Sequence, residues 1–234
     1  MEPTGSADSL FGLTFDIAAL EQLLALGGPV VIILSCLSIV GLAIALLKVQ
    51  QFRRAKIWRT AGVSASVRAF RAGDLAAANA GLATADSALA RAVAAAVSGV
   101  SEKSPDVARE VTEITATAEI EALRGGLRPL EFIAAVSPLL GLFGTVLGMI
   151  AAFQALESAG DRVDPAVLAG GIWEALFTTA AGLAVAIPAL ALSNWFERSL
   201  DTLAHRMEHF TGLVLTATAR ADAPPAQQTA VAAE

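Results

Sequence analysis

The most apolar part of the C-terminal half reads, from Gly171 to Pro188, Gly-Ile-Trp-Glu-Ala-Leu-Phe-Thr-Thr-Ala-Ala-Gly-Leu-Ala-Val-Ala-Ile-Pro. It lies within segment 165–196, where Glu174 is the single charged residue among 31 neutral ones. A helix of that length can cross a bilayer. A charged side chain near the bilayer centre costs about 2.5 to 3.5 kcal/mol on insertion scales, so it normally faces a partner or water. The stretch therefore predicts an ion or proton pathway beside Glu174.

Two other charge-free stretches have the length of a membrane span, at 22–47 and 132–156. The hydrophobic fraction is 55% and the charged fraction 16%, against about 45 to 50% and 25% in soluble proteins. The sequence thus predicts an all-α integral membrane protein with three transmembrane helices, at 22–48, 131–156 and 167–196. Long helices are expected to extend from them into the cytoplasm.

Basic residues predict the orientation, because they collect on the cytoplasmic flanks of spans. Of the 16 Lys and Arg residues, none precedes the first span, 12 lie between the first two spans, one lies in the second loop and three follow the third span. The segments 1–21 and 157–166 are therefore predicted to be periplasmic, and the loop 49–130 and the C-terminus cytoplasmic. Acidic residues near the N-terminus argue against a cleaved signal peptide, and Cys36 is expected to be a packing residue.

Glycine, serine and proline divide the cytoplasmic parts. Breaks between helices are predicted at Gly73-Asp74, at 81–86 and at 99–104, with a bend at Gly125-Gly126. An apolar pattern over 11–26 predicts an interfacial helix. A further amphipathic helix is expected at 197–220, followed by a disordered tail at 221–234.

Small residues repeat every four positions in the second and third spans, where they let helices approach closely in lipid. Helix packing is the expected role of Gly141, Gly144, Gly148 and Gly182, and Pro188 is expected to loosen the third span. Thr145 has two open interpretations, a bond to its own helix or a place on a proton path.

Glu174 and Thr178 nearly eclipse on a helix, whereas Thr179 lies about 140° round from Glu174. The two threonines are therefore not expected to serve one point equally. Glu174 itself has an alternative role, as a carboxyl that fixes the contact with a neighbouring subunit.

One pattern suggests an enzyme. His205-Arg-Met-Glu-His209 matches the inverted zinc-protease pattern, but a third ligand is available only from Asp222 or Glu234 in the expected tail. No metal site, cofactor, catalytic residue or nucleic-acid partner is predicted, and the chain is not expected to be an enzyme.

Two motifs resemble the second and third spans of the MotA/TolQ/ExbB proton-channel family. They are Ser-Pro-Leu-Leu-Gly-Leu-Phe-Gly-Thr-Val-Leu-Gly-Met from Ser137 to Met149 and the stretch from Gly171 to Pro188. The resemblance extends to the three-span topology and to Phe70-Arg-Ala-Gly-Asp-Leu, and it covers about residues 25–215.

The resemblance implies a multi-pass subunit of a Gram-negative inner membrane. Identical copies would form a ring, expected to have five members, around an ExbD/TolR-type single-span partner that carries the titrating intramembrane Asp. Thr145 and Thr179 match the polar residues that face that partner, and Glu174 matches the family's intramembrane Glu. Thr178 stands where relatives carry a small apolar residue, so its hydroxyl is a departure that leaves open which threonine faces the pathway.

The expected function is to use the proton gradient to energise a TonB-type protein for outer-membrane transport, as in the ExbB branch. A TolQ-type subunit that acts with a TolA-like protein in envelope maintenance is the first alternative. A passive membrane scaffold is the second.

Overall fold

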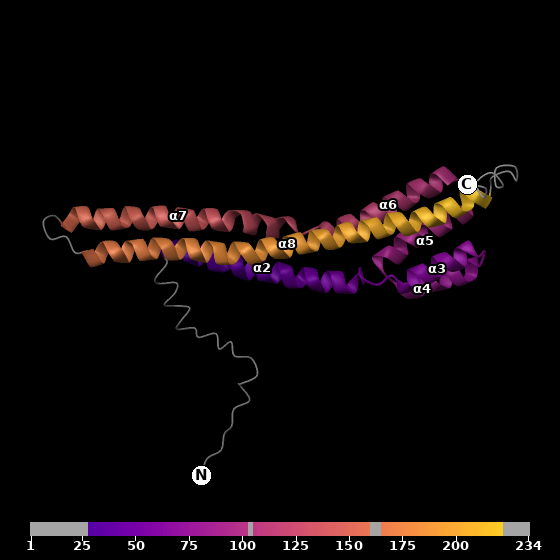
Figure 1. Cartoon of the computed structure of the whole chain (residues 1–234), viewed down its shortest axis with the longest axis horizontal. Helices are drawn as coiled ribbons and strands as arrows, with labels where there is room; N and C mark the ends of the chain where they lie inside the picture. Colours follow the sequence, from indigo (N-terminus) through magenta and orange to yellow (C-terminus); the bar gives the residue numbers. More distant parts are fainter. Residues whose placement is uncertain (1–27, 103–104, 160–164, 222–234) are drawn as a thin grey trace, which may run out of the picture. The chain divides into compact units, whose positions relative to one another are not determined.

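The computed structural model describes residues 28–102, 105–159 and 165–221, and every regular element within them is an α-helix. The all-α prediction is confirmed for this part of the chain (Figure 1). The helices are α2 (Gly28–Arg54), α3 (Ala61–Arg71), α4 (Leu75–Ala85), α5 (Ala88–Glu102), α6 (Pro105–Arg124), α7 (Arg128–Ala159) and α8 (Pro165–Ala221). Within these described residues, three stretches are long and apolar enough to cross a membrane: Gly28–Arg54, Asp106–Ser158 and Pro165–Ala217.

The chain divides into two compact units. The first comprises Met1–Leu42 and Glu131–Leu190, and the second comprises Ala43–Leu130 and Ala191–Glu234. Helices α2, α7 and α8 each contribute residues to both.

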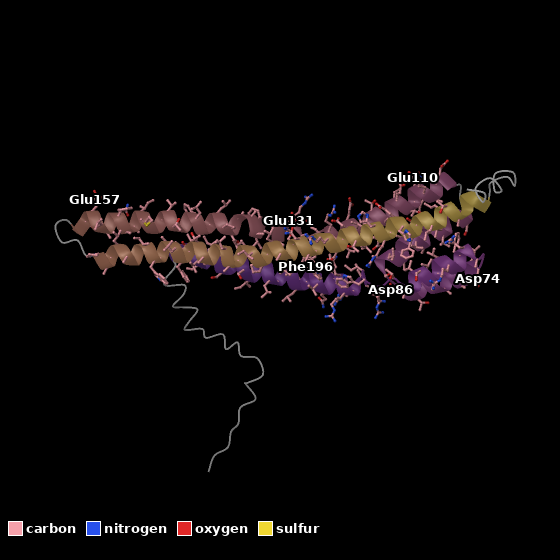
Figure 2. All side chains as sticks on the ribbon, viewed as in Figure 1. Asp74, Asp86, Glu110, Glu131, Glu157 and Phe196 are labelled. Carbon is pink, nitrogen blue, oxygen red and sulfur yellow. The ribbon has the colours of Figure 1, made fainter. Side chains whose placement is uncertain are left out.

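In the first unit, α7 and α8 lie side by side (Figure 1). Figure 2 shows Glu131 and Glu157 at opposite ends of the charge-free part of α7. Helix α2 buries one narrow face here, which includes Leu34, and leaves Ile32, Ile33, Ile39 and Val40 about half exposed or more. A helix that is apolar on all sides but buried on one is typical of a membrane span.

In the second unit, local capping sets where the short helices begin. Asp74 caps α4 by accepting a hydrogen bond from the Ala77 N–H at 2.9 Å, and Ser87 accepts one from the Ala90 N–H at 3.1 Å at the start of α5. Asp86 ends α4 in the left-handed conformation, with φ of 37°. Large side chains fill the core of this unit: Phe52, Ile57, Leu89, Val93, Phe196, Leu200, Leu203 and Met207.

Two glycines that were expected to mark breaks lie inside helices instead. Gly81 is in α4 and Gly99 is in α5. Each faces a neighbouring helix at close range: Gly81 faces the Ser66 hydroxyl, and a Cβ atom on Gly99 would lie 3.0 Å from the Ala108 Cα. These glycines therefore permit close packing, and the chain turns at Asp86, the last residue of the predicted break 81–86.

Two helices run past the ends of the predicted spans, in line with the expectation that long helices extend from them. Helix α2 continues to Arg54, past the predicted end at 48, and α8 continues through Pro188 to Ala221 without a break. Helices α7 and α8 occupy both ends of the predicted turn 157–166. The bend after α6 lies at 125–127, where Gly126 has φ of +82°. The expected interfacial helix 11–26, residues 22–27 of the first span and residues 222–234 of the expected tail lie outside the described residues.

Candidate functional site

The α7–α8 seam is the line of closest approach between the two helices. A Cβ atom placed on Gly182 would lie 2.6 Å from the Ser137 carbonyl oxygen, and one on Gly141 would lie 3.0 Å from the Thr178 carbonyl oxygen. These distances are shorter than a normal Cβ contact, so larger side chains do not fit there. The seam consists of Ser137, Gly141, Gly144, Gly148 and Ala152 on α7 and Gly171, Ala175, Thr178, Thr179 and Gly182 on α8.

Residue pairs along the seam define an antiparallel register. Ser137 lies opposite Gly182, Gly148 opposite Ala175, and Ala152 opposite Gly171. All four glycines assigned to packing on sequence grounds lie on this line. Small residues at such spacing bring helix backbones together where hydrocarbon burial provides no driving force.

Thr178 and Thr179 converge on one carbonyl of α7. Their hydroxyl oxygens lie 3.4 Å and 3.3 Å from the Gly141 carbonyl oxygen. Adjacent residues lie about 100° apart on a helix, so the two threonines of α8 flank the line along which α7 lies. Thr178 also donates to the Ala175 carbonyl at 2.7 Å and is 2% exposed, whereas Thr179 is half-buried.

Thr145 lies one helical turn from Gly141 on α7. Its hydroxyl donates to the Leu142 carbonyl of its own helix at 2.7 Å, and the residue is half-buried. The sequence left two interpretations of Thr145 open. The contact that the structure describes is the first of them, a bond to its own helix.

Glu174 is half-buried on α8, one turn before Thr178, and lies beside the first residue of α2. A Cβ atom on Gly28 would lie 3.2 Å from the Glu174 Oε1. Gly28 has φ of +59°, a conformation that glycine adopts readily. A helix N-terminus carries partial positive charge, which favours a nearby carboxylate. No role for Gly28 was predicted from the sequence, although it stands in a Gly-Gly-Pro stretch.

In the second unit, Lys48 is 6% exposed and lies against the end of α6. Its Nζ donates to the Leu123 carbonyl at 2.9 Å and to the Gln51 side-chain oxygen at 2.7 Å, while the Gln51 amide donates to the Ala122 carbonyl at 3.1 Å. Lysine near a helix C-terminus satisfies its last carbonyls and complements its dipole. In the sequence analysis, Lys48 is counted only among the basic residues that predict the orientation of the spans.

Arg91 of α5 and Glu119 of α6 form a two-point ion pair with nitrogen–oxygen distances of 2.5 Å and 2.6 Å. The hydrogen bond that Arg91 donates to Glu119 is the main reason that the pKa of Arg91 is raised, and the charges of Glu119 and Asp86 add to the effect.

The two histidines of the zinc-protease pattern lie on α8. His205 lies 3.6 Å from the Glu208 carboxylate, and the His209 ring lies against Phe210. Within the described ranges, no three His, Cys, Asp or Glu side chains gather in a way that could hold a metal ion.

The described residues thus combine helices long and apolar enough to span a membrane with a seam of small residues beside one isolated carboxylate, as in a polytopic helical membrane protein. Residues 82–209 match the MotA/TolQ/ExbB proton channel family. The chain belongs to this family, as the sequence motifs predicted.

Named relatives carry both the ExbB and the TolQ label. The chain is 43% identical over 102 residues to biopolymer transport protein exbB1 of Vibrio cholerae, a region that is 42% of this chain and 45% of that protein. It is 40% identical over 112 residues to a putative ExbB-like protein of Synechocystis, 47% of this chain and 43% of the relative. It is 47% identical over 76 residues to the Tol-Pal system protein TolQ of Haemophilus influenzae, 32% of this chain and 33% of the relative. The chain thus spans less than half the length of each of these three relatives.

Proposed function

We propose that this chain is an inner-membrane subunit of a Gram-negative proton-driven complex. Copies of it form a ring, expected to have five members, around an ExbD/TolR-type single-span protein with an intramembrane Asp. The complex uses the proton gradient to energise a TonB-type protein for outer-membrane transport. The chain is a multi-pass protein with a periplasmic N-terminus and a cytoplasmic C-terminus, and it is neither an enzyme nor a cofactor-binding protein.

The observation that carries this proposal is the position of Glu174. It is the one charged residue of segment 165–196 and lies next to Ala175 of the seam that holds α7 against α8. A carboxyl retained at that depth carries a free-energy cost, so a functional role is the default interpretation. The membrane potential supplies about 2.3 kcal/mol per charge per 100 mV, which can bias the partner within the ring.

The two neighbouring threonines receive different roles. Thr178 is buried and bonded to its own helix, so its hydroxyl serves the seam. Thr179 is half-buried, as is Thr145, and both keep part of their surface accessible in the single chain. We assign Thr145 and Thr179 to the surface that faces the partner, and Glu174 to support of that surface.

We take the ExbB branch first. The match to exbB1 is longer, 102 residues against 76, but the match to TolQ has the higher identity, 47% against 43%. A TolQ-type subunit that acts with a TolA-like protein in envelope maintenance is the alternative. A deletion strain separates them: lost gradient-dependent uptake across the outer membrane supports the first, and leakage of periplasmic proteins with normal uptake supports the second.

A passive scaffold is the second candidate, and one observation favours it. The hydroxyls of Thr145 and Thr178 already donate to carbonyls of their own helices, and Glu174 lies beside the start of α2. Under this alternative the three polar residues only fix helix contacts.

The test replaces Glu174 by Gln and, separately, Thr145 and Thr179 by Val, and measures assembly and gradient-dependent function in the same cells. Normal assembly with lost function supports the transducer. Joint loss of assembly and function supports the scaffold, and normal function in all three variants rejects the transducer. Glu157→Gln is the matched control, because Glu157 is exposed at the end of α7 and loses the same charge.

A further inference from the structure

A small pocket in the second unit combines aromatic rings with positive charge. It has a volume of about 240 Å³ and is lined by Ile57, Trp58, Trp195, Arg198, Ser199, Thr202 and Arg206. The indole rings of Trp58 and Trp195 stack with centroids 6.1 Å apart and an angle of 30° between their planes. The two tryptophans are 47% and 44% exposed, so an apolar surface stays open beside the guanidinium groups.

The two arginines of the pocket form no ion pair within the described part of the chain, because neither Arg198 nor Arg206 has a carboxylate within ion-pair distance there. Arg206 donates to the Ile57 carbonyl at 3.4 Å, which fixes one guanidinium nitrogen at the pocket wall. The remaining donors of the two arginines are suited to a phosphate group, which guanidinium binds by paired hydrogen bonds.

The pocket also lies where a membrane surface is expected. Trp195 is next to Phe196, the expected cytoplasmic end of the third span, and Trp58 follows the end of α2 at Arg54. Tryptophan is enriched at membrane–water interfaces, and basic residues on the cytoplasmic side attract anionic lipids.

A second surface of the same unit repeats this chemistry. One face of α2 presents Leu46 and Leu47, which are 62% and 66% exposed, and then Arg53 and Arg54. The apolar side chains are suited to contact the acyl chain of an anionic lipid, and the arginines are suited to contact its headgroup. Two copies of the same cationic surface would repel one another, which argues against a symmetric contact between them.

We propose that the pocket of Trp58, Trp195, Arg198 and Arg206 binds the phosphate headgroup of an anionic phospholipid from the cytoplasmic leaflet. The guanidinium groups bind the phosphate, and the stacked indoles contact the glycerol and the first acyl carbons. This inference rests on the membrane location given under the proposed function. It is independent of proton transfer at Glu174.

The chain offers its own reporters for a test. It has three tryptophans, and Trp173, exposed on α8 in the first unit, is removed as Trp173→Phe so that Trp58 and Trp195 carry the fluorescence. The full chain in mixed micelles is titrated with phosphatidylglycerol or phosphatidylcholine brominated close to the headgroup. The expected result is stronger quenching by the anionic lipid at equal mole fraction.

The preference for phosphatidylglycerol over phosphatidylcholine is expected to fall about fivefold in Arg198→Gln and in Arg206→Gln. This is the factor by which one basic residue strengthens binding to an anionic membrane surface. Arg198→Lys, which keeps the charge but loses the paired hydrogen bonds, is expected to lose less of the preference than Arg198→Gln and shows that the position tolerates substitution. Arg109→Gln is the matched control, because Arg109 is exposed on α6 and does not line the pocket. Equal quenching by both lipids, or the same loss in the control, would overturn the proposal.

Two further measurements separate other occupants. Displacement of the brominated lipid by millimolar inorganic phosphate would assign the pocket to free phosphate. A fall in the mass of the assembly in the two Gln variants would assign it to a contact between copies. Either result overturns the lipid site.

The Glu174→Gln variant separates the inference from the proposed function. If the protein shows no preference for the anionic lipid while its gradient-dependent function is intact, only the lipid site is rejected. If Glu174→Gln loses gradient-dependent function but keeps the preference for the anionic lipid, the proposed lipid site still holds.

Discussion

At the scale of single residues, the seam depends on glycine because backbone atoms of the partner helix occupy the space of a side chain. Gly182→Ala would place its Cβ 2.6 Å from the Ser137 carbonyl oxygen and 3.0 Å from the Gly141 Cα. Overpacking of this kind costs about 1 to 3 kcal/mol. We therefore expect Gly182→Ala to lower the midpoint of thermal unfolding of the full chain in detergent.

Gly170→Ala is the control for this prediction. Gly170 is on the same helix, and nothing lies within 4 Å of the position of its Cβ. Alanine is the better helix former by about 0.5 to 1 kcal/mol, so this variant should be unchanged or slightly more stable. Equal destabilisation of the two variants would contradict the close approach of α7 and α8.

Residue spacing alone could predict which glycines share a helix face, but it could not distinguish two uses of glycine. Gly126 supplies a positive φ at a turn, whereas Gly81 and Gly99 make room for neighbouring helices. Both roles are filled by glycine, so the sequence alone does not tell them apart. The contact of Gly28 with Glu174 was also out of reach, because it joins segments far apart in the chain and no local periodicity encodes it.

At the scale of helices, Lys48 links α2 to the end of α6. Lys48→Met removes the donor to the Leu123 carbonyl, and a buried acceptor without a partner costs about 1 to 3 kcal/mol. Faster amide hydrogen exchange is expected over the last turn of α6 and at 125–127, as measured by mass spectrometry. Arg54→Met serves as the control, because Arg54 is exposed on the same helix and loses the same charge. Similar exchange in the two variants would count against the link.

Helices α5 and α6 are joined by the Arg91–Glu119 pair, whose side chains are 48% and 20% exposed. Because solvent screens such a pair, Glu119→Gln should lower stability by no more than about 1 kcal/mol. The difference from the parent should shrink at high salt, when unfolding midpoints are compared at two ionic strengths. Glu113→Gln, an exposed carboxylate on α6, is expected to show no salt-dependent difference.

The pH dependence of this pair follows from the raised pKa of Arg91. A pKa that is higher in the folded state adds stability below the unfolded value and loses it as pH rises through the folded one. Arginine titrates above about pH 12, so titration of Arg91 should leave stability constant across roughly pH 6 to 9. A midpoint that changes in this range in the parent and not in Arg91→Gln would contradict this account.

At the scale of the whole molecule, the spans could be predicted because lipid excludes charge over a fixed thickness, and charge-free runs are visible in any sequence. The continuous run of α8 through Pro188 was harder to foresee. Proline breaks helices in water, but spans tolerate it because neighbouring groups satisfy the freed carbonyl. How copies and partners assemble is not a property of a single chain, which is why the ring remains a proposal.

The orientation of the chain is the last prediction. With Cys36→Ser, which removes the single native cysteine, one new cysteine is placed as Ser98→Cys on α5 or as Ser158→Cys near the end of α7. Both serines are exposed. The distribution of lysine and arginine predicts that Ser98 is cytoplasmic and Ser158 periplasmic. A maleimide that cannot cross the inner membrane should therefore label Ser158→Cys in cells with a permeabilised outer membrane, and should label Ser98→Cys only after lysis. Labelling of Ser98→Cys in unlysed cells would reverse the orientation, and it would place the arginine pocket on the outer side.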